Sequence, residues 1–403
     1  MKLLIVSQHF YPDPFRINDI APELVRRGHE VTVLTSLPDY ATGKVPASCK
    51  GLKNRKFNYN GVKVVRCFSV SRRSGVLFRA LNYFSFCVTS TVKGFFMRQR
   101  FDAVLCYQTS PVLMANAARR VAKKQKVPFI CYCLDIWPAC IKAWGVGEGS
   151  PLYKLMHRYS RRLYNSANLV LVSSKPFTGY LNSVNGVPTQ KMVYLPQHAE
   201  DMGLSAWQPV PGRLVRLAFG GNIGSVQNVE LFIRAAAAVW HSGVQNFKVE
   251  LYGDGSELEN CKALCEQLNA GECVQFYGRV SQKELWQAYE QADAFLLSLK
   301  EQGEFGLTVP AKLQEYMSGG RAVLAAIGGG AAQIITTADC GLVCGAEDEA
   351  AFAGMLKRFI QNPADFARMA ENGRGYYLQH FTQQKVLDQL EQILTQTVKG
   401  EQV

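Results

Sequence analysis

The sequence predicts an α/β protein with two domains, each built on a doubly wound parallel sheet. First, a length of 403 residues suits two domains of ordinary size. Second, short continuous apolar runs alternate with helical patterns, as expected for strands that are covered on both faces of a sheet. Third, Glu200–Arg213 has no period and contains two glycines and two prolines, which is typical of an interdomain linker.

The first domain is expected over residues 1–199. The run Lys2–Val6, the helical pattern Ile17–Arg27 and the run Val31–Thr35 make a βαβ unit. The same alternation continues with strands expected at Val62–Val65, Ala103–Cys106, Phe129–Leu134 and Leu169–Val172, and helices at Val112–Lys124 and Leu152–Ser166.

The second domain is expected over residues 214–375. Its strands are predicted at Val215–Phe219, Lys248–Tyr252, Val274–Tyr277, Ala294–Leu299, Ala322–Ala326 and Gly341–Val343. Its helices are predicted at Val229–His241, Ser256–Leu268, Ser281–Ala292 and Pro310–Ser318. Residues 376–403 are expected to form a C-terminal helix that packs back on the first domain. Because ligands of such sheets bind at the carboxyl ends of the strands, site residues are sought there.

Charge is divided unevenly between the two halves. Residues 1–200 hold 29 Lys and Arg against 9 Asp and Glu, whereas residues 201–403 hold 16 against 23. We therefore expect the first domain to face an anionic surface. Nucleic acid would account for this charge but not for the motifs described below, so no nucleic-acid partner is expected.

The segment Val76–Met97 is long enough to cross a bilayer, but Arg79, Asn82 and Lys93 interrupt it. A helix that lies in the membrane interface suits this composition better. The alternative is a core helix whose Lys and Arg extend to solvent. We favour interface binding because the surrounding domain is so basic.

Cysteine usage and the N-terminus both favour a cytoplasmic protein. None of the twelve cysteines falls in the paired spacing of a zinc site, and most have apolar neighbours. Met1-Lys-Leu-Leu-Ile-Val leads directly into a strand pattern, without the cleavage region of a signal peptide.

Glycine loops follow two of the predicted strands. The first runs from Gly220 to Asn228 and includes Gly221, Asn222, Gly224 and Gln227. Glycines allow close backbone approach to a ligand, and the following helix start attracts phosphate. The alternative is a tight strand-to-helix turn. The second loop, Gly253-Asp254-Gly255, is interpreted as mainly structural.

Two further motifs carry candidate binding residues. Arg279 and Val280 follow a strand, and the pattern of Ser281 and Glu284 after them is a capping box. The capping box gives Ser281 and Glu284 a structural role but does not explain Arg279, which is therefore a candidate to bind a diphosphate. Lys312 and Glu315 share one face of a helix near its positive end, where phosphates are favoured. The alternative for this pair is an exposed ion pair of little consequence.

Taken in order, these motifs resemble those of the retaining, GT-B-fold glycosyltransferases of family 4. The matching motifs are Gly-Asn222-x-Gly, Gly-Asp254-Gly, Gly278-Arg-Val and Pro310-Ala-Lys-x-x-Glu315-Tyr-Met. The first half resembles bacterial transferases that build O-antigen and capsule repeat units, such as N-acetylfucosamine transferases. That likeness lies in Gln8–Thr35 (QHFYPDPFRINDIAPELVRRGHEVTVLT) and Leu134–Pro138 (LDIWP).

The resemblance implies two Rossmann-like domains that close over a nucleotide sugar, with these roles for the residues. The donor diphosphate would be approached by Gly221, Asn222, Gly224 and Gln227. The base would lie near Arg279 and Val280, and the ribose would be held by Glu315. The phosphates and the donor sugar would lie against the loop of Gly306, Leu307 and Thr308. Lys312 would stabilise the leaving diphosphate, and Asp135 and His9 would act on the acceptor side, although a solvent-facing loop histidine is an equal alternative for His9.

One glutamate departs from the family pattern. The family spaces its two glutamates eight positions apart, and eight positions before Glu315 stands Leu307. Glu304 or Glu301 would then have to reach the donor sugar from a longer loop, which makes Glu315 the better supported residue.

The activity implied is retaining transfer from a UDP-sugar, with an N-acetylated amino sugar as a candidate, to a polyprenyl-diphosphate-linked saccharide. No acidic metal motif stands out, so no metal cofactor is expected. The enzyme would work on the cytoplasmic face of the membrane, bound through its basic domain and residues 76–97. A nucleotide-sugar epimerase of the same fold and a non-catalytic partner subunit remain the alternatives, and the absent dinucleotide fingerprint disfavours a dehydrogenase.

Overall fold

The computed structural model describes residues 1–40, 43–51, 53–73, 75–300 and 303–401. The chain divides into two compact units: unit 1 comprises Met1–Gln197 and Val386–Val403, and unit 2 comprises His198–Lys385. The expected linker therefore falls inside unit 2. Met202 is buried in the core of this unit, and the Trp207 indole donates a 3.0 Å hydrogen bond to Asp293.

Unit 1 is built on an eight-stranded sheet with the order β3-β4-β2-β1-β5-β6-β7-β8. Its strands are β1 (Lys2–Val6), β2 (Glu30–Thr35), β3 (Lys56–Tyr59), β4 (Val62–Arg66), β5 (Ala103–Gln108), β6 (Phe129–Cys133), β7 (Leu169–Val172) and β8 (Met192–Tyr194). The chain winds outward from β1 in both directions, which makes the sheet doubly wound. All its strand pairs are parallel except β3–β4. The sequence analysis predicted a parallel sheet and did not predict β3, because Lys56 and Asn58 are exposed, Phe57 and Tyr59 are only partly buried, and no apolar run marks the strand.

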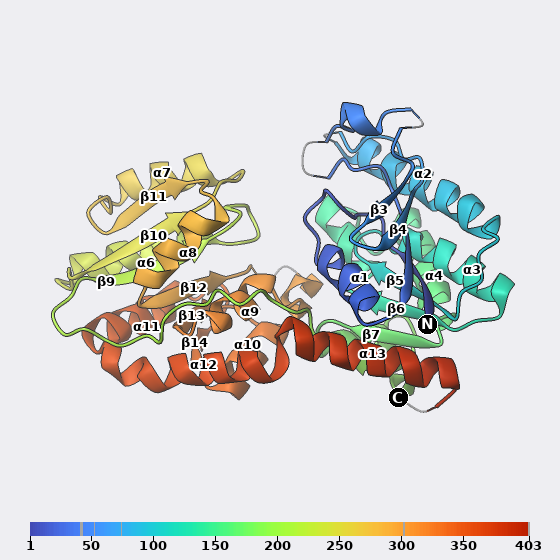
Figure 1. Ribbon diagram of the computed structural model, residues 1–403. Helices are drawn as coiled ribbons and strands as arrows, with labels where there is room; N and C mark the ends of the chain where they lie inside the picture. The colour runs from blue at the N-terminus through green and yellow to red at the C-terminus, as the bar shows by residue number, and fades with distance from the viewer. Residues whose placement is uncertain (41–42, 52, 74, 301–302, 402–403) are drawn as a thin grey trace. The chain divides into compact units, whose positions relative to one another are not determined.

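Helices cover both faces of this sheet (Figure 1). They are α1 (Ile17–Arg26), α2 (Val76–Phe95), α3 (Ala115–Gln125), α4 (Pro151–Asn165), α5 (Pro176–Ser183) and α13 (Gln383–Lys399). Apolar residues of α1 and α13, among them Leu24, Leu390 and Leu394, share one core with the strands. On the other face, α3 contacts β1, β5 and β6, and α2 packs on α3.

Unit 2 is built on a six-stranded, fully parallel sheet with the order β11-β10-β9-β12-β13-β14. Its strands are β9 (Val215–Gly220), β10 (Phe247–Tyr252), β11 (Val274–Gly278), β12 (Ala294–Ser298), β13 (Ala322–Ala326) and β14 (Gly341–Cys344). Counted along the chain this is the 3-2-1-4-5-6 order of a Rossmann sheet, whose switch point lies between β9 and β12.

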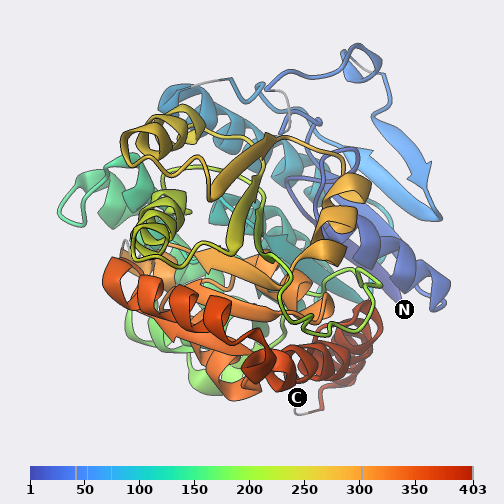
Figure 2. The same ribbon diagram turned by 90° about the vertical axis from the view of Figure 1, so that its left-hand side faces the viewer.

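Two groups of helices sandwich the unit 2 sheet, as Figures 1 and 2 show. One core lies under α6 (Val229–His241), α7 (Leu258–Gln267) and α11 (Glu349–Gln361). A second core lies under α8 (Gln282–Gln291), α9 (Ala311–Ser318), α10 (Gly329–Ala338) and α12 (Ala367–His380).

The single C-terminal helix expected over 376–403 is instead two helices. The chain leaves α12 at Phe381, whose ring is buried in the unit 2 core, and α13 starts at Gln383. Among the helices of the described residues, none combines the length and the apolar composition that a bilayer crossing requires.

Candidate functional site

A pocket of about 390 Å³ lies at the carboxyl ends of β9, β10 and β11. We call it the glycine-loop pocket, and its lining residues are Gly221, Asn222, Tyr252, Gly253, Asp254, Arg279, Val280 and Leu285. The structure thus brings together four residues from two separate predicted motifs. The other four lining residues were not among the predicted site residues.

The pocket floor is made of two glycine loops that touch through their backbones. The Gly221 N–H donates a 2.8 Å hydrogen bond to the Tyr252 carbonyl, and the Gly253 N–H donates one of 2.7 Å to Gly278. A Cβ atom on Gly253 would overlap the carbonyl of Gly221. The interpretation of residues 253–255 as mainly structural was therefore incomplete, because the loop also lines the pocket. Its position directly after a strand was the signal that could have identified it.

The Asn222 side chain is held in place by its own loop. Its amide nitrogen donates a 2.9 Å hydrogen bond to the Gln227 side chain. Gly224 lies so close that a Cβ there would stand 2.5 Å from the Asn222 amide nitrogen. Gly224 and Gln227 do not line the pocket themselves, but they position Asn222 at its rim.

Lys312 lies directly against the first glycine loop. A Cβ on Gly221 would stand 2.5 Å from the ammonium nitrogen of Lys312, which also lies 3.9 Å from the centre of the Phe219 ring. This nitrogen is buried, and no hydrogen-bond partner for it exists within the described residues. Burial lowers the pKa of Lys312 to about 8, although the nearby Glu315 carboxylate opposes the shift. An unpaired buried ammonium group beside open backbone loops indicates an anion site.

Glu315 lies one turn after Lys312 on α9 and acts on it electrostatically. Of the predicted donor loop, Gly306 and Leu307 belong to a short 3-10 helix over Gly303–Leu307, and Thr308 follows it. The side chain of Glu304, in the same turn, and the whole of Glu301 lie outside the described part of the structure.

A third glycine run, which the sequence analysis did not single out, meets that loop. Gly329 begins α10, and a Cβ there would overlap the carbonyl of Gly306. The run Gly328–Gly330 follows β13 and leads into the first turn of α10, so it is also a glycine run between a strand and a helix. This run is a further element against which the 306–308 loop packs.

Asp135 lies at the carboxyl edge of the unit 1 sheet, two residues beyond β6. Its carboxylate accepts a 2.7 Å hydrogen bond from the Ser110 N–H. Burial raises the pKa of Asp135, and the hydrogen bonds from Ser110 oppose that rise. The backbone of Ser110 therefore fixes the Asp135 carboxylate at the edge of the sheet where ligands of such folds bind.

His9 is not the solvent-facing loop residue considered as an alternative, because its ring is only 2% exposed. It stacks on Phe15, with ring centres 4.9 Å apart, and meets the edge of Tyr40. Neither ring nitrogen has a hydrogen-bond partner within the described residues. Burial, with the Arg72 charge, lowers the pKa of His9 to about 3, so the ring is neutral. Phe15 and Tyr40 come from loops after β1 and β2, so this burial depends on tertiary packing.

Asp13 and Asp39 complete a buried group with His9, here called the His9 cluster, whose candidate ligand atoms lie within 4.8 Å of one another. Asp39 accepts hydrogen bonds from the Arg72 N–H (2.8 Å) and from Asn82 (3.0 Å). Burial raises the pKa of Asp39 to about 6. The residue types could bind a divalent cation. However, Arg72 acts on Asp39 and Arg66 on Asp13, so two guanidinium groups already offset the two carboxylates.

Comparisons with known proteins match both units. A family model described as "Glycosyl transferase 4-like domain" matches residues 15–198, and one described as "Glycosyl transferases group 1" matches residues 209–376. The probable glycosyltransferase WbjE of Pseudomonas aeruginosa is 24% identical over 312 residues, which cover 73% of this chain and 75% of that protein.

Solved structures share the architecture over the full length. HepE of Anabaena, in complex with UDP and glucose, superposes with a TM-score of 0.68 at 16% identity, covering 98% of this chain and 99% of that one. Sucrose-phosphate synthase of Thermosynechococcus elongatus gives a TM-score of 0.72 at 15% identity, covering 99% and 100%. With one family model on each unit and two doubly wound sheets, the chain belongs to the GT-B glycosyltransferases of family 4.

Proposed function

We propose that the enzyme transfers a sugar, with retention of configuration, from a UDP-sugar to a polyprenyl-diphosphate-linked saccharide. The product would be an intermediate of a cell-surface polysaccharide of the O-antigen or capsule type. The observation that carries the donor part is Lys312, whose buried ammonium nitrogen has no partner within the described residues and lies against Gly221. A nucleoside diphosphate is the anion that this fold binds at the carboxyl ends of its strands.

The pocket supplies chemistry for each part of such a donor. The backbone at Gly221 and Gly253 would approach the diphosphate, with Lys312 beneath it. Arg279 is exposed at the rim, and Tyr252 stacks on Tyr277 with ring centres 4.6 Å apart, which gives the base a flat apolar neighbour. The structure of HepE in complex with UDP supports uracil as that base. Glu315 would accept the ribose hydroxyls.

In the proposed reaction the bond between the anomeric carbon and the diphosphate breaks, and a bond to the acceptor oxygen forms on the same face. The acceptor proton passes to the leaving phosphate. Negative charge therefore grows on the diphosphate, where Lys312 and the loop amides lie. Each preorganised donor of this kind contributes about 3 kcal/mol to transition-state stabilisation.

The proposed acceptor and site of action follow from unit 1. Its net charge is strongly positive, and Asp135 and the His9 cluster lie at its carboxyl edge. A lipid-linked diphosphate at the inner face of the membrane matches that charge. We also propose that no resident divalent cation is required, because Arg66 and Arg72 already balance the carboxylates of the His9 cluster.

The donor proposal is tested by thermal shift with UDP, GDP and dTDP, on the wild type and on Glu315→Ala. UDP is expected to stabilise the wild type most, and its effect is expected to shrink in the variant. Equal stabilisation of both proteins would remove Glu315 from the site. Product analysis by NMR, with and without a lipid-linked acceptor, then reports the anomeric configuration and separates transfer from epimerisation. Activity that EDTA abolishes and Mg²⁺ restores would contradict the metal-free proposal.

A further inference from the structure

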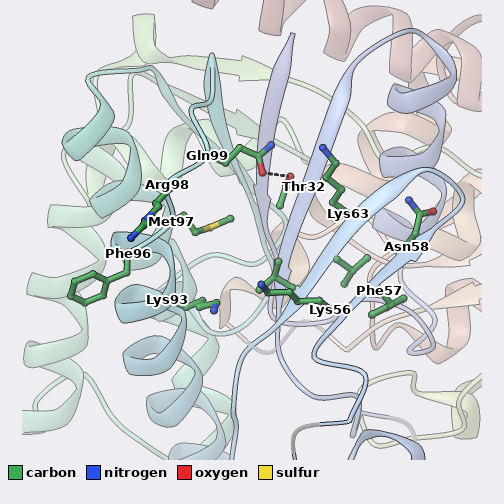
Figure 3. Close-up of a pocket in the computed structure, with 12 residues that line it drawn as sticks. Thr32, Lys56, Phe57, Asn58, Lys63, Lys93, Phe96, Met97, Arg98 and Gln99 are labelled. Atoms are coloured by element: carbon green, nitrogen blue, oxygen red, sulfur yellow. Dashed lines mark hydrogen bonds between the residues drawn. The ribbon is translucent and has the colours of Figure 1, made fainter.

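A second cavity, of about 620 Å³, lies in unit 1 between the β3–β4 pair and the C-terminal end of α2 (Figure 3). We call it the basic groove. Four of its lining residues are cations, namely Lys56, Lys63, Lys93 and Arg98, and none is acidic. Phe57, Val64, Val65, Phe96 and Met97 supply apolar walls. This combination suits a ligand that has both an anionic and an apolar part.

Three of these four cations have no ion-pair or hydrogen-bond partner in the described part of the chain. Lys63 forms an exposed ion pair with Glu30 at 3.8 Å. Within the described residues, the side chains of Lys56, Lys93 and Arg98 form no ion pair or hydrogen bond. Figure 3 shows Lys56 and Lys93 extending toward each other from the strand side and from the helix side. Their charges are therefore available to an external anion.

The apolar face of α2 leads into this groove. Along the helix, the exposed large apolar residues are Leu77, Leu81, Phe84, Val88, Val92 and Phe95, spaced three or four apart on one side. Phe84 is 64% exposed, and Phe96, which lines the groove just beyond the helix, is 72% exposed. The opposite side of α2, with Phe86 and Gly94, is buried. The stripe and the groove together form one continuous surface.

The sequence around this surface lacks negative charge altogether. Residues 40–101 contain 13 Lys and Arg and no Asp or Glu. A surface that joins an apolar helix face of about 30 Å to a row of unpaired cations complements an anionic bilayer. Water-soluble anions would use the cations but not the stripe.

The groove is separate from the catalytic edge of unit 1. His9 and Asp135 follow the carboxyl ends of β1 and β6. Neither residue lines the groove. The groove is formed by side chains of β2, β3 and β4 and by the C-terminal end of α2 with the residues that follow it, at the opposite end of that helix from its start after β4. Anything bound there leaves the carboxyl edge open to an acceptor.

From this geometry we infer that the basic groove holds the phosphate headgroup of an anionic phospholipid while the α2 stripe lies among the acyl chains. The inference rests on the proposed function, which places the enzyme at a membrane, and adds a specific headgroup site to it. The enzyme is thereby attached to the bilayer at a point distinct from its acceptor, with α2 parallel to the membrane surface.

The test is co-sedimentation of the full chain with vesicles of phosphatidylcholine that contain about 30 mol% phosphatidylglycerol, and with pure phosphatidylcholine. The groove variant is Lys56→Ala/Lys93→Ala/Arg98→Ala. Its control, Lys283→Ala/Arg368→Ala/Lys385→Ala, removes three exposed cations of unit 2. At about 1 kcal/mol per cation near the surface, the groove variant is expected to lose on the order of a hundredfold in vesicle affinity, and the control only a few-fold.

A second variant, Leu77→Ser/Phe84→Ser, tests the stripe and is expected to weaken binding to the anionic vesicles although it changes no charge. Equal losses in the groove and control triples would overturn the headgroup site. Saturable stabilisation by glycerol phosphate without any binding to the anionic vesicles would also overturn it, because the ligand would then be a soluble phosphate and not a lipid. The UDP-induced thermal shift is measured on the same samples. If UDP does not raise the melting temperature of the wild type, the donor proposal is refuted. If UDP stabilises the groove variant as much as the wild type, the fold and the donor site of that variant are intact.

Discussion

The glycine-loop pocket of unit 2 and the His9 cluster of unit 1 both bury titratable groups at the carboxyl edge of a doubly wound sheet. They treat charge in opposite ways. Beside the pocket, against Gly221, Lys312 has a buried nitrogen without a hydrogen-bond partner among the described residues. In the cluster, Asp13 and Asp39 are offset by Arg66 and Arg72, and His9 is neutral.

The difference shows which site is waiting for a charged ligand. An unpaired buried cation destabilises the protein until an anion arrives, so ligand binding recovers the cost of its desolvation. A cluster whose charges are already balanced gains little from a further charge. Under the proposed function, the donor side would therefore hold an unpaired cation and the acceptor side polar groups whose charges are balanced.

Lys312→Met would break this comparison most strongly. Removing the buried charge should raise the stability of the ligand-free protein at pH 7 by up to about 3 kcal/mol, because the free energy that burial costs the ammonium group, whose pKa it lowers to about 8, disappears. The same change should weaken UDP binding on the order of a hundredfold. Thermal melts with and without UDP measure both effects, and Lys283→Met is the matched surface control. A variant that loses stability and keeps its UDP affinity would contradict the assignment.

Acid titration of the His9 cluster sharpens the comparison from the other side. The folded pKa of Asp39 is raised to about 6, so its contribution to stability grows as pH falls toward 4. The folded pKa of His9 is lowered to about 3, so its contribution is lost as pH falls from 6.5. The two nearly cancel between pH 6 and 4.5. Asp39→Asn should therefore lose about 1.5 kcal/mol more stability than the wild type across that interval.

Urea unfolding at the two pH values measures this difference, with the exposed Asp365→Asn as the control. His9→Gln should show the reverse, a relative gain on acidification. If acidification changes the unfolding free energy of both variants in the same direction relative to the wild type, Asp39 and His9 do not make opposite contributions to stability.

The pH dependence of UDP affinity separates the two sites. Because the pKa of Lys312 in the ligand-free protein is about 8, UDP must bind with proton uptake above that pH. The Kd should be level below pH 8 and rise about tenfold per unit above it. Calorimetry in two buffers of different ionisation enthalpy detects the proton directly. A level profile to pH 9.5 would exclude Lys312 as the phosphate partner.

The smallest expected effect comes from the residue that orients Asn222. Gln227→Ala removes one hydrogen bond to the Asn222 amide, which is worth about 1 kcal/mol. UDP affinity should fall about fivefold, without a change in its pH profile. A Gln227→Glu variant keeps an acceptor for the Asn222 amide and should recover part of the loss. A UDP affinity of Gln227→Glu below that of Gln227→Ala would indicate that the added negative charge near the diphosphate outweighs the restored hydrogen bond.

Local sequence pattern predicted the elements with continuous apolar runs well, and β1 and β7 match residue for residue. It failed where stability comes from elsewhere in the chain. The edge strand β3 alternates polar and partly buried residues, and His9 is buried by Phe15 and Tyr40, whose proximity no local pattern shows.

The site was predictable to a similar degree. Glycine loops after strands are visible in the sequence, so Gly221 and Asn222 were found together with Arg279. That Lys312 would lack a partner was not visible, because it depends on Phe219 and Gly221 packing around it. The spacing of the acidic residues predicts that Glu304 is out of register, and this stays a prediction because its side chain lies outside the described structure.

The position of α13 has a consequence for how the protein is made. Val386, Leu387, Leu390, Ile393 and Leu394 are buried against strands of unit 1 that are translated first. Arg27 also forms an ion pair with Glu391, and a ring nitrogen of His29 lies 2.9 Å from the same carboxylate. The first unit therefore cannot close its core on the ribosome until nearly four hundred residues have been synthesised, whereas every buried residue of the second unit emerges before that moment. The unit translated first is the one completed last, and its exposed apolar surface has to be protected from aggregation throughout synthesis.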